Sequence, residues 1–252
     1  MAYTRLESFG SIAQNYDRFR PGYPPALIDE LMRLGPRRVL DIGCGTGKAA
    51  VALAERGVEV LGVEIDERMA EIARGHGIEV EVASFEAWDD AGRKFDTLIS
   101  GQAWHWVDPV SGPLKAARLL EPGGTMALFW NTDRKREPLG SVIDAIYREQ
   151  VPELMATIDA LVAHHRDRPY VAPLEASGAF QSVSMQYFDS ERVDTRDQWL
   201  GMIGTHSDHV TLEPERRERL LASVGAAIDA AGGTIAVDVS TYLVLATTPG
   251  RE

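Results

Sequence analysis

Short apolar segments alternate with helical segments along the first half of this chain of 252 residues. Five segments have the length and apolar character of buried strands: residues 39–42, 58–63, 78–82, 95–100 and 125–130. Helical spacing of apolar residues occurs in the ranges 26–34, 48–56, 66–76 and 109–120. Strands that alternate with helices predict an α/β fold, in which helices cover both faces of a mostly parallel sheet.

The alternation stops after residue 131. Residues 132–178 are charged and predict two or more helices without a strand between them. Strands are expected again at 183–188 and 234–246, with helices at 195–204 and 213–231. We interpret residues 1–252 as a single domain in which residues 132–178 and 195–231 are helical additions that shape a substrate pocket. The polar and aromatic residues 1–24 are expected to form a lid segment.

Charge and cysteine content restrict the classes of partner. The chain has 38 acidic and 26 basic residues and a formal net charge of −12, a field that repels polyanions such as nucleic acids. The lone cysteine, Cys44, excludes an intrachain disulfide and fits a reducing compartment. No apolar stretch approaches the roughly 20 residues that span a bilayer. We therefore expect a cytoplasmic protein with a small-molecule substrate and with no nucleic-acid or membrane partner, and the oligomeric state stays open.

A glycine-rich loop follows the first predicted strand. Gly43, Gly45 and Gly47 lead directly into a helix, so the backbone can turn sharply and a ligand can approach it closely. Such a loop predicts a nucleotide-like ligand at the carboxyl end of the strand. The phosphate-loop pattern fails because Ala49 follows Lys48, whereas residues 45–50 fit the dinucleotide pattern Gly-x-Gly-x-x-Ala. A nicotinamide-dependent oxidoreductase is therefore one possible function.

Two acidic residues favour a different ligand. Asp41 ends the first strand beside the loop, where a carboxylate disfavours a pyrophosphate and suits a ligand with positive charge. S-adenosylmethionine is such a ligand because it carries a sulfonium and an ammonium group. Glu64 closes the second strand about 20 residues after Gly43, which is the spacing of an acidic side chain that accepts hydrogen bonds from ribose hydroxyls.

Several segments together resemble the class I S-adenosylmethionine-dependent methyltransferases. Residues 39–47 with Glu64 resemble motif I and the acidic second-strand position of that family. Residues 95–100 are similar to its fourth strand, and residues 121–124 to the turn before its fifth. The stretches 15–24 and 102–106 resemble the branch that methylates small molecules.

This resemblance implies a fold, a cofactor and a reaction. The fold is a doubly wound, Rossmann-like sheet of seven strands in the order 3-2-1-4-5-7-6, with the seventh strand antiparallel. The cofactor is S-adenosylmethionine, whose methyl group passes to a small organic acceptor by direct in-line displacement. A second alternative, beside the oxidoreductase, is a protein that binds S-adenosylmethionine without methylating anything.

The resemblance and the residues together give the candidate cofactor site. The loop residues are expected to hold the methionine part and Glu64 the ribose, with three further residues around the adenine. The full set is Asp41, Gly43, Cys44, Gly45, Gly47, Glu64, Ile65, Ser84, Phe85 and Gln102. Cys44 is expected to pack as a small side chain within the loop, and Gln102 to hold a polar group of the cofactor or substrate.

The acceptor is expected to bind beside the residues that follow the fourth strand. His105 is the candidate catalytic residue, as a general base or as a group that orients the acceptor. The substrate-binding candidates are Tyr16, Arg20, Tyr23, Trp104, Trp106 and His206. The histidines at 164–165 and 206–209 match no strong ligand spacing, so no metal is expected.

Overall fold

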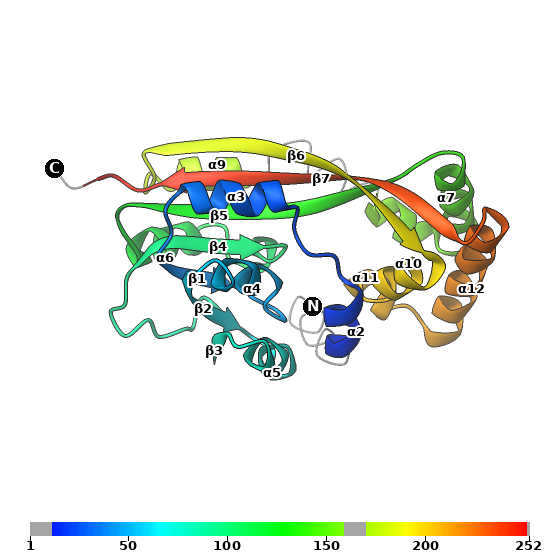
Figure 1. Ribbon diagram of the computed structural model, residues 1–252, viewed down its shortest axis with the longest axis horizontal. Coiled ribbons are helices and arrows are strands. Elements are labelled where there is room, and N and C mark those ends of the chain that lie inside the picture. The colour runs from blue at the N-terminus through cyan, green and yellow to red at the C-terminus, as the bar shows by residue number, and fades with distance from the viewer. Residues whose placement is uncertain (1–11, 159–169, 251–252) are drawn as a thin grey trace. The chain divides into compact units, whose positions relative to one another are not determined.

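The computed structural model describes residues 12–158 and 170–250, and in them it contains a seven-stranded sheet (Figure 1). The strands are β1 (Arg38–Ile42), β2 (Glu59–Glu64), β3 (Glu79–Val82), β4 (Phe95–Gly101), β5 (Leu120–Lys135), β6 (Ser182–Thr195) and β7 (Thr234–Thr247). Their order, β3-β2-β1-β4-β5-β7-β6, confirms the predicted topology. The first five pair in parallel.

The last strand runs against β5. Gly123 N donates to Pro249 O, Thr248 N donates to Gly124 O and Arg136 N donates to Ala236 O. Residue numbers therefore rise along β5 as they fall along β7, which is an antiparallel pair. This agrees with the expected orientation of the last strand.

The described helices are α2 (Ala13–Phe19), α3 (Pro25–Arg33), α4 (Lys48–Ala54), α5 (Glu67–Gly75), η2 (Trp104–Trp106), α6 (Ser111–Leu119), α7 (Leu139–Gln150), α9 (Val171–Ala176), α10 (Arg196–Ile203), α11 (Ser207–Val210) and α12 (Pro214–Ala230). None of the helices in the described part of the chain is both long and apolar enough to cross a membrane. Elements up to residue 120 lie within a few residues of the ranges expected from the sequence.

The chain divides into two compact units. The sheet unit comprises Gly22–Asn131, Arg168–Phe188 and Thr241–Glu252, and the second unit comprises Met1–Pro21, Thr132–Asp167 and Asp189–Ser240. Most of the helices expected at 132–178 and 195–231 belong to the second unit. A single domain with helical additions and a lid at residues 1–24 stays a prediction, and residues 1–11 of that lid lie outside the described part.

The sheet unit has one apolar cluster on each face of its sheet. Helices α3, α4 and α5 cover one face, and α6 and α9 cover the other (Figure 1). Sequence signals fix where these helices begin. Pro25 is the first residue of α3, where its missing N–H costs no hydrogen bond. Asp66 caps α5, because its Oδ1 accepts a hydrogen bond from Arg68 N at 2.9 Å.

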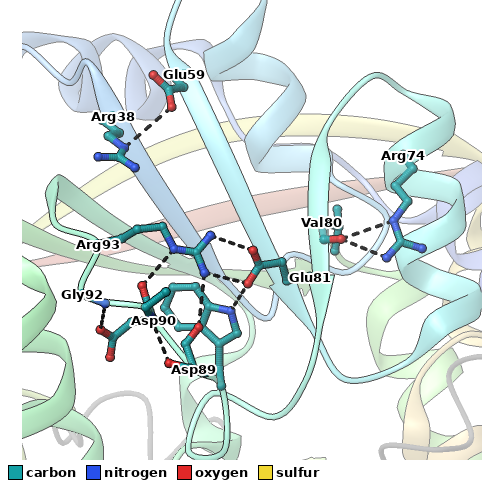
Figure 2. A network of polar contacts seen from close by, with 11 residues as sticks. Arg38, Glu59, Arg74, Val80, Glu81, Asp89, Asp90, Gly92 and Arg93 are labelled. Atoms are coloured by element: carbon teal, nitrogen blue, oxygen red, sulfur yellow. Dashed lines mark hydrogen bonds and ion pairs between the residues drawn. The ribbon is translucent and has the colours of Figure 1, made fainter.

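An ion-pair network fixes the loop that follows β3 (Figure 2). The guanidinium of Arg93 donates to both carboxylate oxygens of Glu81, at 2.6 and 2.9 Å, and Trp88 Nε1 donates to the same carboxylate at 2.5 Å. Arg93 also lies over the Trp88 ring. Residues 83–94 are therefore tied back onto the edge strand that precedes them.

The second unit has its own apolar core, which includes Ile143, Trp199 and Leu220. Two strand ends in this unit differ from the prediction. No strand was expected within 132–178, but β5 extends to Lys135, and the sixth strand was expected to end near residue 188, but β6 extends to Thr195. Charged side chains hold these strand ends: Arg192 pairs with Asp133 at 2.7 Å, and Arg136 donates to Asp238. A strand stabilised by ion pairs shows no apolar alternation, which is why the pattern did not reveal it.

Candidate cofactor and acceptor site

The glycine loop joins β1 to α4 in the sheet unit. Gly43, Gly45 and Gly47 all have positive φ, at 68°, 57° and 86°, a conformation that other residues adopt only with strain. A Cβ at Gly43 would lie 2.6 Å from the Cβ of Ala103, so this glycine is required by packing. A Cβ at Gly45 would meet only Met69, at 3.5 Å. Space beside the backbone therefore remains at Gly45, where a ligand could approach.

Asp41 is buried at the end of β1 and is 1% exposed. Its Oδ2 atom has no hydrogen-bond partner among the described residues, and neither has the buried hydroxyl of Thr46 in the loop. Burial, together with the charge of Glu64, raises the pKa of Asp41 to about 8. A cationic ligand would favour the charged carboxylate. The two unpartnered polar atoms thus fit a polar ligand with positive charge. Thr46 was not among the residues predicted from the sequence, because a hydroxyl at this position belongs to no recognisable motif.

Glu64 occupies the end of β2 and supports the loop. Its Oε2 accepts a hydrogen bond from Gly45 N at 2.9 Å, and its Oε1 accepts one from Asp66 N at 3.0 Å. Burial raises its pKa, although the hydrogen bonds from backbone N–H groups act against this. A carboxylate has about four acceptor positions, so it can still receive ribose hydroxyls. Glu64 is therefore both a structural brace and a candidate ligand residue.

Cys44 packs within the loop. Its Sγ occupies the space above Gly62, where a Cβ would lie 2.6 Å from the sulfur. Burial raises the pKa of the thiol well above its usual range, with the charges of Asp41 and Glu64 acting in the same direction. A thiol held in its neutral form is a poor nucleophile, so the contacts favour the packing role.

The three residues expected around the adenine differ in burial. Ile65 and Ser84 are half-buried, and Ser84 Oγ accepts a hydrogen bond from Ala87 N at 3.3 Å. Phe85 is 5% exposed and its ring packs against Trp104, with a centroid separation of 5.8 Å. Phe85 and Trp104 thus belong to the core on the α6 face. This burial favours packing for both, because the ring faces already have protein neighbours.

Gln102 follows β4 in a strained conformation with φ of 60°, which is uncommon for a residue other than glycine. Its Nε2 donates to Asn131 O at 3.2 Å. The Asn131 side chain in turn donates to Gly22 O and accepts from Thr241 Oγ1. Backbone strain of this kind concentrates at functional sites. Asn131 is the last residue of β5 that belongs to the sheet unit, and it was not among the residues predicted from the sequence.

Tyr23 also lies at this edge of the sheet. Its ring makes an edge contact with Phe129, with centroids 4.7 Å apart. A Cβ at Gly101 would lie 2.6 Å from Phe129 Cε2 and still closer to the Tyr23 hydroxyl. Only glycine therefore lets Tyr23 approach the end of β4, which keeps this residue among the substrate candidates.

His105 lies in the short helix η2 with the two tryptophans. Trp130 Nε1 donates to His105 Nδ1 at 3.5 Å, and the Trp130 ring is stacked between Tyr170 and Tyr242 with centroid distances of 4.1 and 5.0 Å. In this long contact Nδ1 is the acceptor, an arrangement that corresponds to the tautomer with its proton on Nε2. His105 is exposed, and Trp106, half-buried, packs against its ring at 4.7 Å.

The other three substrate candidates gather in the second unit. Arg20 donates from Nε to Thr205 Oγ1 at 2.9 Å, and its guanidinium lies over the ring of Tyr16. Burial and the charge of Arg20 lower the pKa of His206 well below its usual range. The structure therefore brings Tyr16, Arg20 and His206 together around Thr205. His164 and His165 lie outside the described residues.

Comparisons with known proteins agree with this geometry. Residues 39–124 match the family described as "Methyltransferase domain". This segment, which holds the glycine loop and Glu64, therefore matches a methyltransferase domain, in line with the resemblance stated above. The match favours S-adenosylmethionine, the cofactor that the resemblance implies, over a nicotinamide dinucleotide.

Relatives extend the likeness beyond this segment. An uncharacterized methyltransferase of Mycobacterium bovis is 40% identical over 143 residues, which are 54% of this chain and 58% of the relative. A ubiquinone biosynthesis O-methyltransferase of Alkalilimnicola ehrlichii is 32% identical over 123 residues, 46% of this chain and 50% of the relative. The chain thus spans less than two thirds of these curated relatives.

Solved structures match over more of the chain. A candidate type II methyltransferase from Anaeromyxobacter dehalogenans has a TM-score of 0.65 and 25% identity, over 92% of this chain and 98% of the other. The phosphoethanolamine N-methyltransferase 2 of Haemonchus contortus, solved with S-adenosylhomocysteine, shares the fold with a TM-score of 0.52 and 14% identity, over 95% of this chain and 57% of the other.

The raised pKa of Asp41 gives the methyltransferase domain an expected pH dependence. A cationic cofactor should convert the protonated carboxyl to a carboxylate and release a proton. Affinity for S-adenosylmethionine should therefore rise with pH, by at most about tenfold per unit, and level off above the pKa of about 8. Without ligand, the stability of the folded protein has the opposite pH dependence. The free energy of unfolding falls as pH rises from 3.8 to about 8, because the unfolded protein loses the Asp41 proton at lower pH than the folded protein does.

Calorimetric titration across this range measures the effect, and two buffers of different ionisation enthalpy count the released proton. Asp41→Asn, which cannot titrate, should bind more weakly and with little pH dependence. An equal pH slope in Asp41→Asn and the unsubstituted protein would assign the proton to another group.

Proposed function

We propose that this protein transfers the methyl group of S-adenosylmethionine to a small organic acceptor by direct in-line displacement. The observation that carries the proposal is the combination of the open glycine loop with a buried, unpartnered Asp41 oxygen in a methyltransferase domain. The sulfonium supplies an electrophilic methyl group when the cofactor is bound. The protein itself then has to position the reactants and exclude water.

We assign roles to the site residues on this basis. The backbone of Gly43, Gly45 and Gly47 lies against the methionine part, and Asp41 balances its positive charge. Glu64 accepts the ribose hydroxyls. Ile65, Ser84 and Phe85 border the adenine, Phe85 through the edge of its buried ring.

The acceptor is proposed to bind beside Tyr23, His105 and Trp106, next to the end of β4. A small acceptor is supported by the relatives that match, among them a ubiquinone biosynthesis O-methyltransferase, and by the net charge of −12, which repels nucleic acids. We also propose that the protein works in the cytoplasm, as expected from its lone cysteine.

One experiment separates this function from the alternatives. The protein should bind S-adenosylmethionine and S-adenosylhomocysteine with much higher affinity than NAD. Incubation with a library of phenols, amines, thiols and carboxylic acids should then yield S-adenosylhomocysteine with at least one acceptor, detected by mass spectrometry. Tight cofactor binding with no turnover on any class would favour a non-methylating S-adenosylmethionine-binding protein.

The tautomer of His105 predicts its contribution once an acceptor is known. Because Nε2 carries the proton, we expect the ring to donate a hydrogen bond and to orient the acceptor. His105→Ala should then mainly raise the KM for the acceptor, and His105→Asn, which keeps a donor, should restore part of the loss. Steady-state kinetics at saturating cofactor measure both parameters.

A general base would give a different result. His105→Ala would then lower kcat by about 10²–10⁴-fold and remove an ionisation from the pH–rate profile. Trp130→Phe provides the matched test of the tautomer, because it keeps an aromatic ring between Tyr170 and Tyr242 but removes the N–H donor. If His105 is a general base, the pH–rate profile of Trp130→Phe should still contain the ionisation that His105→Ala removes.

A further inference from the structure

Three metal-ligating side chains meet in the second unit, next to the substrate candidates Tyr16 and Arg20. One donor atom from each of His206, Asp208 and His209 lies within 4.8 Å of the other two. Asp208 and His209 belong to α11, and His206 is its N-cap residue. The side chains of Asp208 and His209 are only 15% and 2% exposed, which distinguishes this cluster from solvated acidic groups at the surface.

The contacts of His209 match those of a ligating histidine. Its Nδ1 lies 2.8 Å from Asp208 Oδ1, and its Nε2 lies 2.6 Å from the hydroxyl of Tyr147, which is itself 5% exposed. Histidine ligands commonly donate the N–H of the second ring nitrogen to an oxygen, which fixes the tautomer and the ring orientation. Tyr147 is placed to accept such a bond from Nε2, which would leave Nδ1 as the ligand atom.

A cationic side chain also lies near the cluster. Arg20, held on Thr205, adds a positive charge that opposes a dication, so affinity should be moderate.

We propose that His206, Asp208 and His209 bind a divalent first-row transition ion such as Zn²⁺, and that Tyr147 orients His209 as a positioning residue. Two imidazole nitrogens and one carboxylate suit Zn²⁺, Co²⁺ or Ni²⁺, whereas Mg²⁺ and Ca²⁺ prefer oxygen ligands alone. On binding, His209 takes the neutral tautomer with its proton on Nε2, exchanged through solvent from Nδ1; Nε2–H then donates to the Tyr147 hydroxyl, and the Nδ1 lone pair coordinates the ion. The site is independent of the methyl-transfer proposal and amends the expectation that no metal binds.

Co²⁺ is the probe, because its visible absorption reports the ligand field directly. Protein without a histidine tag should bind one Co²⁺ saturably and release it to Zn²⁺. His206→Ala should weaken binding at least tenfold, while His76→Ala, which removes an exposed histidine of the sheet unit, should leave it unchanged. Arg20→Gln should tighten binding, because it removes the opposing charge.

Tyr147→Phe tests the positioning role. It should weaken Co²⁺ binding by roughly 10–100-fold, the range typical of residues that orient a ligand. The matched Tyr187→Phe, at an exposed tyrosine, should have no effect. Circular dichroism verifies that each variant is folded. Absence of saturable binding up to millimolar Co²⁺, or equal affinity in folded His206→Ala, would overturn the proposal.

Discussion

Glu64→Ala should abolish measurable cofactor binding and also destabilise the protein. The substitution removes the acceptor for Gly45 N and Asp66 N, and hydrogen bonds to charged groups contribute about 1.5–3 kcal/mol each. Because the side chain is only 9% exposed, water cannot fully replace them. We expect the free energy of unfolding to fall by about 2–4 kcal/mol and the cofactor affinity to fall at least roughly a hundredfold.

Isothermal titration with S-adenosylhomocysteine and chemical denaturation measure the two effects separately. Glu64→Gln should lie between Ala and the unsubstituted protein in both, since the amide retains one acceptor oxygen. Glu59→Ala is the matched control, because Glu59 lies on the same strand but is exposed and pairs with Arg38 at the surface. If Glu64→Gln is folded and binds cofactor at full affinity, the ribose assignment is wrong.

Gly45→Val should eliminate cofactor binding at a smaller cost in stability. With φ of 57°, a β-branched residue at this position is strained, at a cost of about 1–3 kcal/mol. Its Cβ would meet only Met69, so the side chain would fill the open space beside the loop rather than clash with the core. Any ligand that lies there would be displaced.

Gly35→Val separates strain from displacement. Gly35 has φ of 69° and nothing within 4 Å of its added Cβ, so the variant carries the same backbone strain outside the loop. Thermal denaturation should give similar losses for both variants, whereas only Gly45→Val should fail to bind S-adenosylhomocysteine in a titration. If Gly45→Val still binds S-adenosylhomocysteine, the cofactor does not lie against this loop.

The sheet order and the glycine loop could be predicted because local rules determine them. Apolar runs mark β1, β2 and β4, and the spacing of Gly43, Gly45 and Gly47 marks the turn into α4. The ends of β5 and β6 could not, because Arg192, Asp133 and their neighbours hold them through ion pairs that apolar periodicity does not register. Boundaries set by tertiary contacts have no local signal.

The positions of the candidate site residues in the sequence could be predicted, but the burial of their side chains could not. The acidic residues at the ends of β1 and β2 were expected as ligand groups, but Glu64 also holds the glycine loop through the hydrogen bond from Gly45 N. Phe85 was expected to border the adenine and Trp104 to bind substrate, and the sequence did not reveal that both side chains are buried and pack against each other. Arg20 and Thr205 are 185 positions apart, so no sequence motif could predict their hydrogen bond or the cluster beside it.

The packing of Cys44 against Gly62 has a practical consequence. A thiol that is 7% exposed and held in its protonated form reacts slowly with maleimides and other thiolate-directed reagents. Since it is also the only cysteine in the chain, no native thiol has to be removed before a labelling site is introduced. One cysteine placed on either unit, for example at the exposed Val110 or Val193, would carry a single fluorophore or spin label on otherwise unmodified protein.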